Sequence, residues 1–203
     1  NINLLFCIGG DGTLKGAQAI AEAANKRQAN ISIVGVPKTI DNDLGFVEKT
    51  FGFETSVQVA SEIITSAHCE AEGAENGIGI VKLMGRDSGF ITATASLANS
   101  VVDFCLIPET PFRFNGPNGI CAAIHRRIEQ NKHAVIVVAE GAGQDLFENS
   151  KKTIDASGNV LKDDIGELLK QEISAYFQQI NTPVSIKYLD PSYHIRSVSA
   201  NAA

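Results

Sequence analysis

Short apolar runs alternate along the chain with longer segments in which apolar residues recur every three or four positions. Short runs bounded by glycine, proline or polar residues are typical of buried strands, whereas the longer spacing is typical of amphipathic helices. On this basis we expect strands at residues 3–8, 31–36, 78–84, 104–107, 134–139 and 184–188. We expect helices at residues 13–26, about 55–68, 90–99, 119–130 and 164–180. This alternation predicts an α/β fold whose open, mostly parallel sheets carry helices on both faces.

The composition is that of an ordinary globular protein. The 203 residues are 44% hydrophobic and 20% charged, and no apolar run is long enough to cross a bilayer. This length corresponds to one large domain or two small ones, and we place a boundary near Phe51. The four cysteines are scattered without paired spacing, which indicates core residues in a reducing compartment. A cytoplasmic location is therefore expected, and an organelle is also compatible.

The formal net charge of −6 disfavours nonspecific binding to nucleic acid or to an anionic membrane. An anionic ligand must therefore be captured locally, by basic side chains and by backbone amides at the starts of helices. The chain begins with Asn1 within a few residues of an apolar run, so we expect that an N-terminal portion is absent.

The second expected strand is followed by the polar sequence Pro-Lys-Thr-Ile-Asp-Asn-Asp at residues 37–43. In a parallel α/β sheet, ligands bind at the carboxyl ends of the strands, where this segment begins. Asp41 and Asp43 repel one another, so the pKa of at least one should rise unless a cation or hydrogen-bond donors hold both ionised. Lys38 and Thr39 supply such groups. The segment is either a catalytic loop, with one carboxylate as proton acceptor and the other groups engaging an anion, or a polar turn.

The first expected strand ends in the sequence Gly-Gly-Asp-Gly-Thr at residues 9–13. Glycines let the backbone approach a bulky anion, and Thr13 is expected to cap the helix whose amide groups face it. A carboxylate beside phosphate oxygens needs a magnesium ion between them, so Asp11 is a candidate Mg²⁺ ligand. The alternative is a glycine-rich turn. Because consecutive parallel strands end at one edge, Asp11 and Asp41 should face one cleft, which would suit phosphoryl transfer.

Two further polar loops follow expected strands. Residues 84–86 read Met-Gly-Arg, and Arg86 offers a planar fork for phosphate while Ser88 is expected to cap the next helix. The alternative is a surface ion pair between Arg86 and Asp87. Glu140, at the end of another strand, suits the binding of sugar hydroxyls or is simply a polar strand end.

The C-terminal part offers a second anion site. Lys187, Tyr193 and Arg196 could bind a second phosphate together, with His194 as an exposed neighbour. Residues 145–164 are polar and lack a clear period, which predicts an excursion over the surface.

These motifs, taken in order, resemble those of the 6-phosphofructokinases. They are residues 9–13, 37–43, 84–86, Glu140 and 193–196. The resemblance covers nearly the whole chain, and the second motif is highly specific, whereas the first is shared with NAD kinases and diacylglycerol kinases. It implies a phosphofructokinase-like, two-domain architecture. It also implies the glycolytic phosphorylation of fructose 6-phosphate at its 1-hydroxyl, with Mg²⁺ as cofactor.

The resemblance implies a role for each matching residue. Asp41 would be the base that takes the proton of the 1-hydroxyl, Thr39 would contact the transferred phosphoryl group, and Asp11 would hold Mg²⁺. The implied catalytic residues are Lys38, Thr39, Asp41, Asp43 and Arg86. The implied donor-site residues are Gly10, Asp11, Gly12 and Thr13. The implied sugar-phosphate ligands are Thr39, Ile40, Asp41, Met84, Gly85, Arg86, Glu140, Lys187, Tyr193, His194, Ile195 and Arg196.

Two positions bear on the phosphoryl donor, and they point in opposite directions. Gly12 is similar to the ATP-dependent members of the family, whereas Lys38 is similar to the pyrophosphate-dependent ones. This mixed pattern resembles the ATP-dependent enzymes of plants and trypanosomatids, and residues 82–90 and 188–193 support that branch. ATP is therefore the expected donor and pyrophosphate the alternative.

The resemblance also implies how the chain is organised. Residues 1–52 would be part of the donor-binding domain, residues 53–195 the sugar-phosphate domain, and residues 196–203 the start of the return to the first domain. The chain would be a fragment, because the first strand and glycine loop of the family precede Asn1. A dimer or tetramer of identical chains is expected, with no nucleic-acid or membrane partner. A non-catalytic regulatory subunit that binds sugar phosphate is the further alternative.

Overall fold

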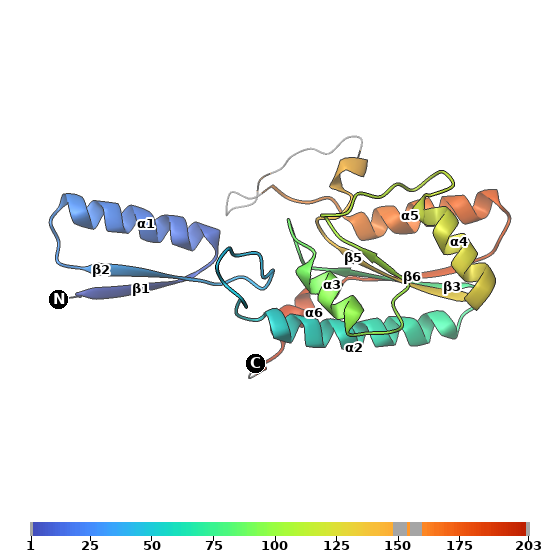
Figure 1. Cartoon of the computed structure of the whole chain (residues 1–203), viewed down its shortest axis with the longest axis horizontal. Coiled ribbons are helices and arrows are strands. Elements are labelled where there is room, and N and C mark those ends of the chain that lie inside the picture. The colour runs from blue at the N-terminus through green and yellow to red at the C-terminus, as the bar shows by residue number, and fades with distance from the viewer. Residues whose placement is uncertain (1, 148–153, 155–159, 202–203) are drawn as a thin grey trace.

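The computed structural model describes residues 2–147, 154 and 160–201, and its strands form two separate sheets (Figure 1). The first unit consists of β1 (Leu4–Gly9), α1 (Asp11–Lys26) and β2 (Ser32–Pro37). The two strands are parallel, from Leu4 opposite Ser32 to Gly9 opposite Pro37. Helix α1 packs along one face of this pair, so the residues on the other face, among them Phe6, remain exposed.

The second unit is a four-stranded parallel sheet with helices on both faces (Figure 1). Its strands lie in the order β4-β5-β3-β6. They are β3 (Gly77–Leu83), β4 (Phe104–Leu106), β5 (His133–Ala139) and β6 (Ser185–Leu189). The helices are α2 (Phe53–Glu72), α3 (Phe90–Leu97), α4 (Ile120–Asn131), α5 (Ile165–Gln179) and α6 (Ser192–Ser197), and a short 3₁₀ turn, η1, spans Gln144–Leu146.

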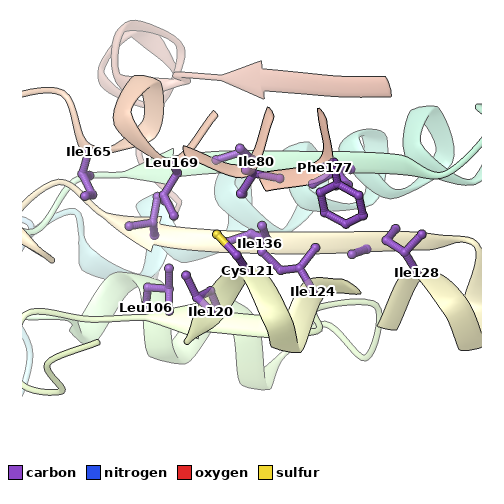
Figure 2. Packing of buried hydrophobic residues seen from close by; sticks show 14 of the residues in the cluster. Ile80, Leu106, Ile120, Cys121, Ile124, Ile128, Ile136, Ile165, Leu169 and Phe177 are labelled. Carbon is purple, nitrogen blue, oxygen red and sulfur yellow. The ribbon is translucent and has the colours of Figure 1, made fainter. Parts of the chain in front are cut away.

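The core of the second unit has two layers, one on each side of the sheet. Ile80 and Ile136 face α4 and α5, where Phe177 is completely buried (Figure 2). Val81 and Leu83 face α2, α3 and α6. Side chains of a strand alternate between faces, so a strand that is buried on both sides needs the continuous apolar runs seen in the sequence.

Most predicted elements are confirmed to within two residues, and so is the α/β class with parallel sheets. The second sheet carries helices on both faces, as predicted, whereas α1 covers one face of the small sheet among the described residues. Helix α6 was not predicted. Within the predicted excursion at 145–164, residues 148–153 and 155–159 lie outside the described part of the chain. The predicted division after residue 52 falls at the start of α2 and stays a prediction.

Both predicted helix caps are wrong. Helix α1 begins at Asp11, two positions before Thr13, and follows Gly10 with no side-chain cap. Helix α3 begins at Phe90 after Gly89, also without a side-chain cap. Glycine provides the non-helical backbone at both starts, and the Ser88 hydroxyl donates instead to the Asp41 carbonyl. Among the described residues, no helix is both long and apolar enough to cross a membrane.

Candidate active site

A cleft of about 600 Å³ opens where the strands of both units end. Its walls come from the turn between β1 and α1, the segment after β2, the loop after β3, the residue after β5 and helix α6. Because all paired strands in the described chain are parallel, their carboxyl ends converge on this edge. The cleft is therefore the place where the sequence predicted a site.

The turn after β1 brings Asp11 to the cleft. Gly9 is close enough to Thr13 that a side chain there would collide with it: a Cβ atom would lie 2.3 Å from the Thr13 hydroxyl oxygen. Asp11 is the first residue of α1 and forms an ion pair with Lys15, one turn later, at 2.5 Å. Both side chains are exposed, so this pair contributes little stability and leaves the carboxylate available to a ligand.

The segment after β2 is held from both sides. The Lys38 amide donates to the Gly9 carbonyl at 2.8 Å, which ties the segment to the first unit. The Asp41 amide donates to the Thr39 hydroxyl at 3.1 Å, and the Ser88 hydroxyl of the second unit donates to the Asp41 carbonyl at 3.2 Å. These bonds fix the backbone of Asp41 at the junction of the two units.

Asn42 closes the turn behind Asp41. Its backbone adopts a left-handed conformation with a φ of 56°, which asparagine tolerates better than most residues. Its side-chain oxygen accepts a hydrogen bond from the Thr50 amide at 2.9 Å. Gly52 is also left-handed, and a Cβ atom there would lie 2.8 Å from the Ile40 side chain. The loop therefore returns tightly to α2 and leaves the Asp41 carboxylate facing the cleft.

The environment raises the pKa of Asp41 above its ordinary value. Partial burial disfavours the charged carboxylate, and the negative charges of Asp43 and Glu140 add to this effect. A hydrogen bond from the Arg86 amide and the positive charge of its guanidinium oppose it but do not cancel it. The result is a more basic carboxylate that still has a cation beside it.

The loop after β3 packs against the end of β5. Gly85 has a φ of +131°, and the Gly141 amide donates to its carbonyl at 3.0 Å. A Cβ atom on Gly141 would lie 1.9 Å from the Arg86 carbonyl oxygen, so only glycine allows this approach. Glu140 thereby enters the same cleft as Arg86.

Arg86 and Asp87 each contact the segment that precedes α5. The Arg86 guanidinium donates to the Val160 carbonyl at 2.6 Å, and Lys162 pairs with Asp87 at 3.0 Å. The predicted alternative of an ion pair between Arg86 and Asp87 is not among these contacts. The loop after β3 is therefore braced from outside the cleft.

Most of the predicted site residues line the cleft. They are Gly10, Asp11, Lys38, Thr39, Ile40, Asp41, Asp43, Met84, Arg86, Glu140 and Arg196. The other predicted residues do not line it: Gly12, Thr13, Gly85, Lys187, Tyr193, His194 and Ile195.

The structure does not bring the predicted second phosphate site together. Lys187 pairs in register with Gly79, in the middle of β3, and its ammonium lies 3.5 Å from Glu70 of α2. Tyr193 is 87% exposed, and Ile195 is buried in the core. Only Arg196 of this group reaches the cleft.

Five further residues line the cleft without having been assigned a role from the sequence. Gly9 and Pro37 belong to the motifs at residues 9–13 and 37–43, and Asp87 was considered only as an ion-pair partner of Arg86. Leu14 and Leu44 carry no local sequence signal for a site. The spacing of Asp11 and Lys15, four positions apart on a helix, does indicate the ion pair that they form.

The described residues contain no group of three or more histidine, cysteine or acidic side chains that could hold a metal by itself. Magnesium does not require one, since it is usually bound by one or two carboxylates together with water and substrate phosphates. The exposed carboxylate of Asp11, at the rim of the cleft, fits such a site.

Comparison with known proteins identifies the family. The family model described as Phosphofructokinase matches residues 1–199. The chain is 52% identical, over its whole length, to the ATP-dependent 6-phosphofructokinase of Borreliella burgdorferi and spans 47% of that protein. It is also 52% identical, again over its whole length, to the chloroplastic ATP-dependent 6-phosphofructokinase 5 of Arabidopsis thaliana and spans 37% of it. The chain thus covers less than half of each relative.

A solved structure shows the same fold. The pyrophosphate-dependent phosphofructokinase from Marinobacter aquaeolei aligns with a TM-score of 0.71 over 99% of this chain and 47% of its own, at 22% sequence identity. The match between the family model and nearly every residue, together with the two relatives, agrees with the resemblance found in the motifs. The chain belongs to the phosphofructokinase family.

Proposed function

We propose that the protein containing this chain transfers a phosphoryl group from ATP to the 1-hydroxyl of fructose 6-phosphate and forms fructose 1,6-bisphosphate. The observation that carries this proposal is the position of Asp41. Its carboxylate faces a cleft that also holds Asp11 on one unit and Arg86 on the other, and its pKa is raised. A base, a candidate magnesium ligand and a cation thus share one space.

Asp41 acts as the general base in this proposal. A base is most effective when its pKa approaches the working pH, because it is then ionised yet still attracts a proton. Burial and the neighbouring carboxylates move the pKa of Asp41 in that direction, and the positive charge of Arg86 limits the rise. Asp41 would take the proton from the sugar hydroxyl as that oxygen attacks phosphorus.

The remaining groups position the phosphoryl group and balance its charge. Lys38 and Arg86 face the cleft as cations, and the Thr39 hydroxyl lies in the same segment. Asp11 would hold the Mg²⁺ that neutralises charge on the donor phosphates when bound. Charge complementarity at the reacting phosphate is the largest contribution that such a site can make.

The donor is proposed to be ATP. Both relatives described above are ATP-dependent enzymes by name. A Cβ atom built on Gly12 would meet nothing within 4 Å, so this side of α1 leaves open space. Lys38, which favours pyrophosphate by family resemblance, lies in the cleft as well, and a direct test of the donor is therefore needed.

The proposed acceptor side consists of Met84, Arg86, Glu140 and Arg196. Glu140 would accept hydrogen bonds from sugar hydroxyls, and the two arginines would bind phosphate oxygens. Assembly into a homo-oligomer and a cytoplasmic location remain predictions from the family resemblance and the composition.

The test is a coupled assay of the full-length protein with fructose 6-phosphate, Mg²⁺ and either ATP or pyrophosphate. We expect turnover with ATP and little with pyrophosphate. Turnover with pyrophosphate alone would overturn the choice of donor. Binding of fructose 6-phosphate without turnover on either donor would replace the enzyme by a non-catalytic sugar-phosphate subunit.

A further inference from the structure

A largely buried lysine next to the loop after β3 has no part in the function proposed above. Lys82 is the second-last residue of β3, and its side chain is only 13% exposed. Its ammonium lies 3.2 Å from Asp164 and 3.0 Å from Asp190, above the ring of Tyr188 at 5.8 Å. Such a group is costly to bury unless it is paired, and here two carboxylates pair with it.

Each of these carboxylates also organises the start of a helix. Asp164 is the N-cap of α5 and accepts hydrogen bonds from the Gly166 and Glu167 amides at 3.0 and 3.3 Å. Asp190 accepts the Ser192 amide at 3.1 Å and the Ser192 hydroxyl, at the start of α6. Lys82 therefore joins the first turns of two helices to the end of the central strand.

Helix α6 depends on such a link. It has only six residues, too few for a helix to be stable by itself. Ile195 anchors it in the core, while Tyr193 is almost fully exposed. Its orientation is therefore set by Ile195 and by the turn at Asp190, and this orientation decides where Arg196 enters the cleft.

We propose that Lys82 is a positioning residue for Arg196, holding α6 through Asp190 so that the guanidinium stays at the acceptor side of the cleft. This inference rests on the proposed function, in which Arg196 binds a phosphate of the acceptor. Without the ammonium, Asp164 and Asp190 face each other as like charges in a partly buried place. Their repulsion would move the start of α6 away from α5.

The test uses the full-length protein and Lys82→Met, which keeps the volume and removes the charge. We expect the KM for fructose 6-phosphate to rise about tenfold, because one charge-assisted hydrogen bond to phosphate is weakened. The KM for ATP should stay within about twofold of the wild-type value. Lys82→Arg should restore most of the loss. Lys170→Met, which removes an exposed lysine of α5 paired with Glu167, is the matched control and should leave both constants unchanged.

A double-mutant cycle separates positioning from general destabilisation. Lys82→Met combined with Arg196→Ala should raise the KM for fructose 6-phosphate no further than Arg196→Ala alone, because Lys82 acts through Arg196. Additive effects, or equal changes in the KM of both substrates, would overturn the proposal. If Lys82→Met does not fold, Asp190→Asn takes its place in the same cycle with the same expectations.

Amide hydrogen exchange tests the role of Lys82 independently of catalytic activity. Amide hydrogen exchange of residues 192–197 should be faster in Lys82→Met than in Lys170→Met. If the wild type transfers no phosphoryl group but this difference is found, the proposed function fails and the link from Lys82 to α6 stands. Equal exchange in the two variants overturns the inference, whatever the activity.

Discussion

The two units that form the cleft differ in how they are packed. In the second unit, two layers of apolar side chains lie on either side of a four-stranded sheet, and Phe177 has no exposed surface. In the first unit, a single helix covers two strands, and Phe6 on the uncovered face is 57% exposed. Ala17 is the one residue of α1 that is buried in the chain described.

This difference shows where the geometry of the site comes from. Arg86 and Glu140 sit on loops that close tightly over a complete core, so their positions are fixed by packing. Asp11 sits at the start of a helix that has little core beneath it. Asp41 connects the two, because its own segment is bonded to Gly9 on one side and to Ser88 on the other.

The largest predicted effect concerns the residue at this junction. Asp41→Asn in the full-length protein should lower kcat by about 10²–10⁴-fold, the usual contribution of a general base. The KM for fructose 6-phosphate should change much less, because the amide keeps the shape of the side chain. Steady-state kinetics with ATP measure both constants. Asp145→Asn, at an exposed aspartate outside the cleft, is the control, and a mutant at Asp41 with near-normal turnover would contradict the role of the base.

The same substitution should stabilise the fold. The pKa of Asp41 is raised on folding, so its protonation contributes stability that is present below the unfolded pKa and is lost as pH rises through the folded value. At neutral pH the ionised carboxylate is therefore a cost that asparagine removes. Thermal denaturation should show a higher melting temperature for Asp41→Asn at neutral pH and a smaller difference in acid. A lower melting temperature at neutral pH would contradict a raised pKa of Asp41 in the folded state.

The next prediction tests the difference in packing directly. Phe177→Ala should reduce the free energy of unfolding by about 3–5 kcal/mol, because it leaves a cavity in a closed core. Phe6→Ala should cost less than about 1 kcal/mol in the isolated chain, because more than half of the side chain is already in water. Urea denaturation followed by circular dichroism measures both. If Phe6→Ala reduces the free energy of unfolding several times more in a longer protein that contains this chain, the exposed face of the first sheet is covered there.

The packing difference also explains what the sequence could and could not predict. Strands β3 and β5 were found to within one residue, because burial on both faces demands long apolar runs such as Ala134–Ala139. Helix α6 was missed because six residues carry no period, and it is held by tertiary contacts of Ile195 with the core and of Asp190 with Lys82. The predictions of helix caps at Thr13 and Ser88 were wrong for a related reason. Side-chain preference at a helix start is weak compared with a glycine already in place.

The sequence likewise predicts the site only in part, because contacts between distant segments cannot be read from it. Residues within one motif, such as Lys38 and Asp41, could be placed because the end of a parallel strand fixes their common location. The position of Lys187 could not be predicted, because its distance from the strand end depends on the register with β3, which the sequence does not reveal. The contacts of Lys82 with Asp164 and Asp190 join segments far apart in the chain.

A further prediction separates the two sides of the cleft by substrate. Gly12→Asp should be accommodated by the fold, since a Cβ atom there meets nothing within 4 Å. The new carboxylate would add a negative charge near the donor phosphates, and the KM for ATP should rise at least about tenfold. The KM for fructose 6-phosphate should stay within about twofold, since the proposed donor site lies on the first unit. Gly12→Ala controls for the lost glycine, and equal changes for both substrates would contradict the division.

A smaller effect is expected where the second unit is hydrogen-bonded to the segment that carries Asp41. Ser88→Ala removes the hydrogen bond to the Asp41 carbonyl, and one such bond contributes about 1 kcal/mol. If that energy holds Asp41 in place, kcat should fall about fivefold, and the melting temperature should fall by about 2–4 °C. Ser96→Ala is the matched control, because the buried hydroxyl of Ser96 has no hydrogen-bond partner in the part of the chain described. A similar loss of turnover in both variants would show that the effect is not specific to the segment.

The smallest predicted effect compares the charge that each side of the cleft places on Asp41. Asp43 lies on the same segment as Asp41, whereas Glu140 follows β5 of the second unit, and both raise the pKa of Asp41, Asp43 more strongly. Removing either charge should lower that pKa, so the acid limb of the kcat profile should move to lower pH by about half a unit. Asp43→Asn should shift it further than Glu140→Gln. A shift towards higher pH in either variant would mean that the neighbouring carboxylate does not act on Asp41 by charge.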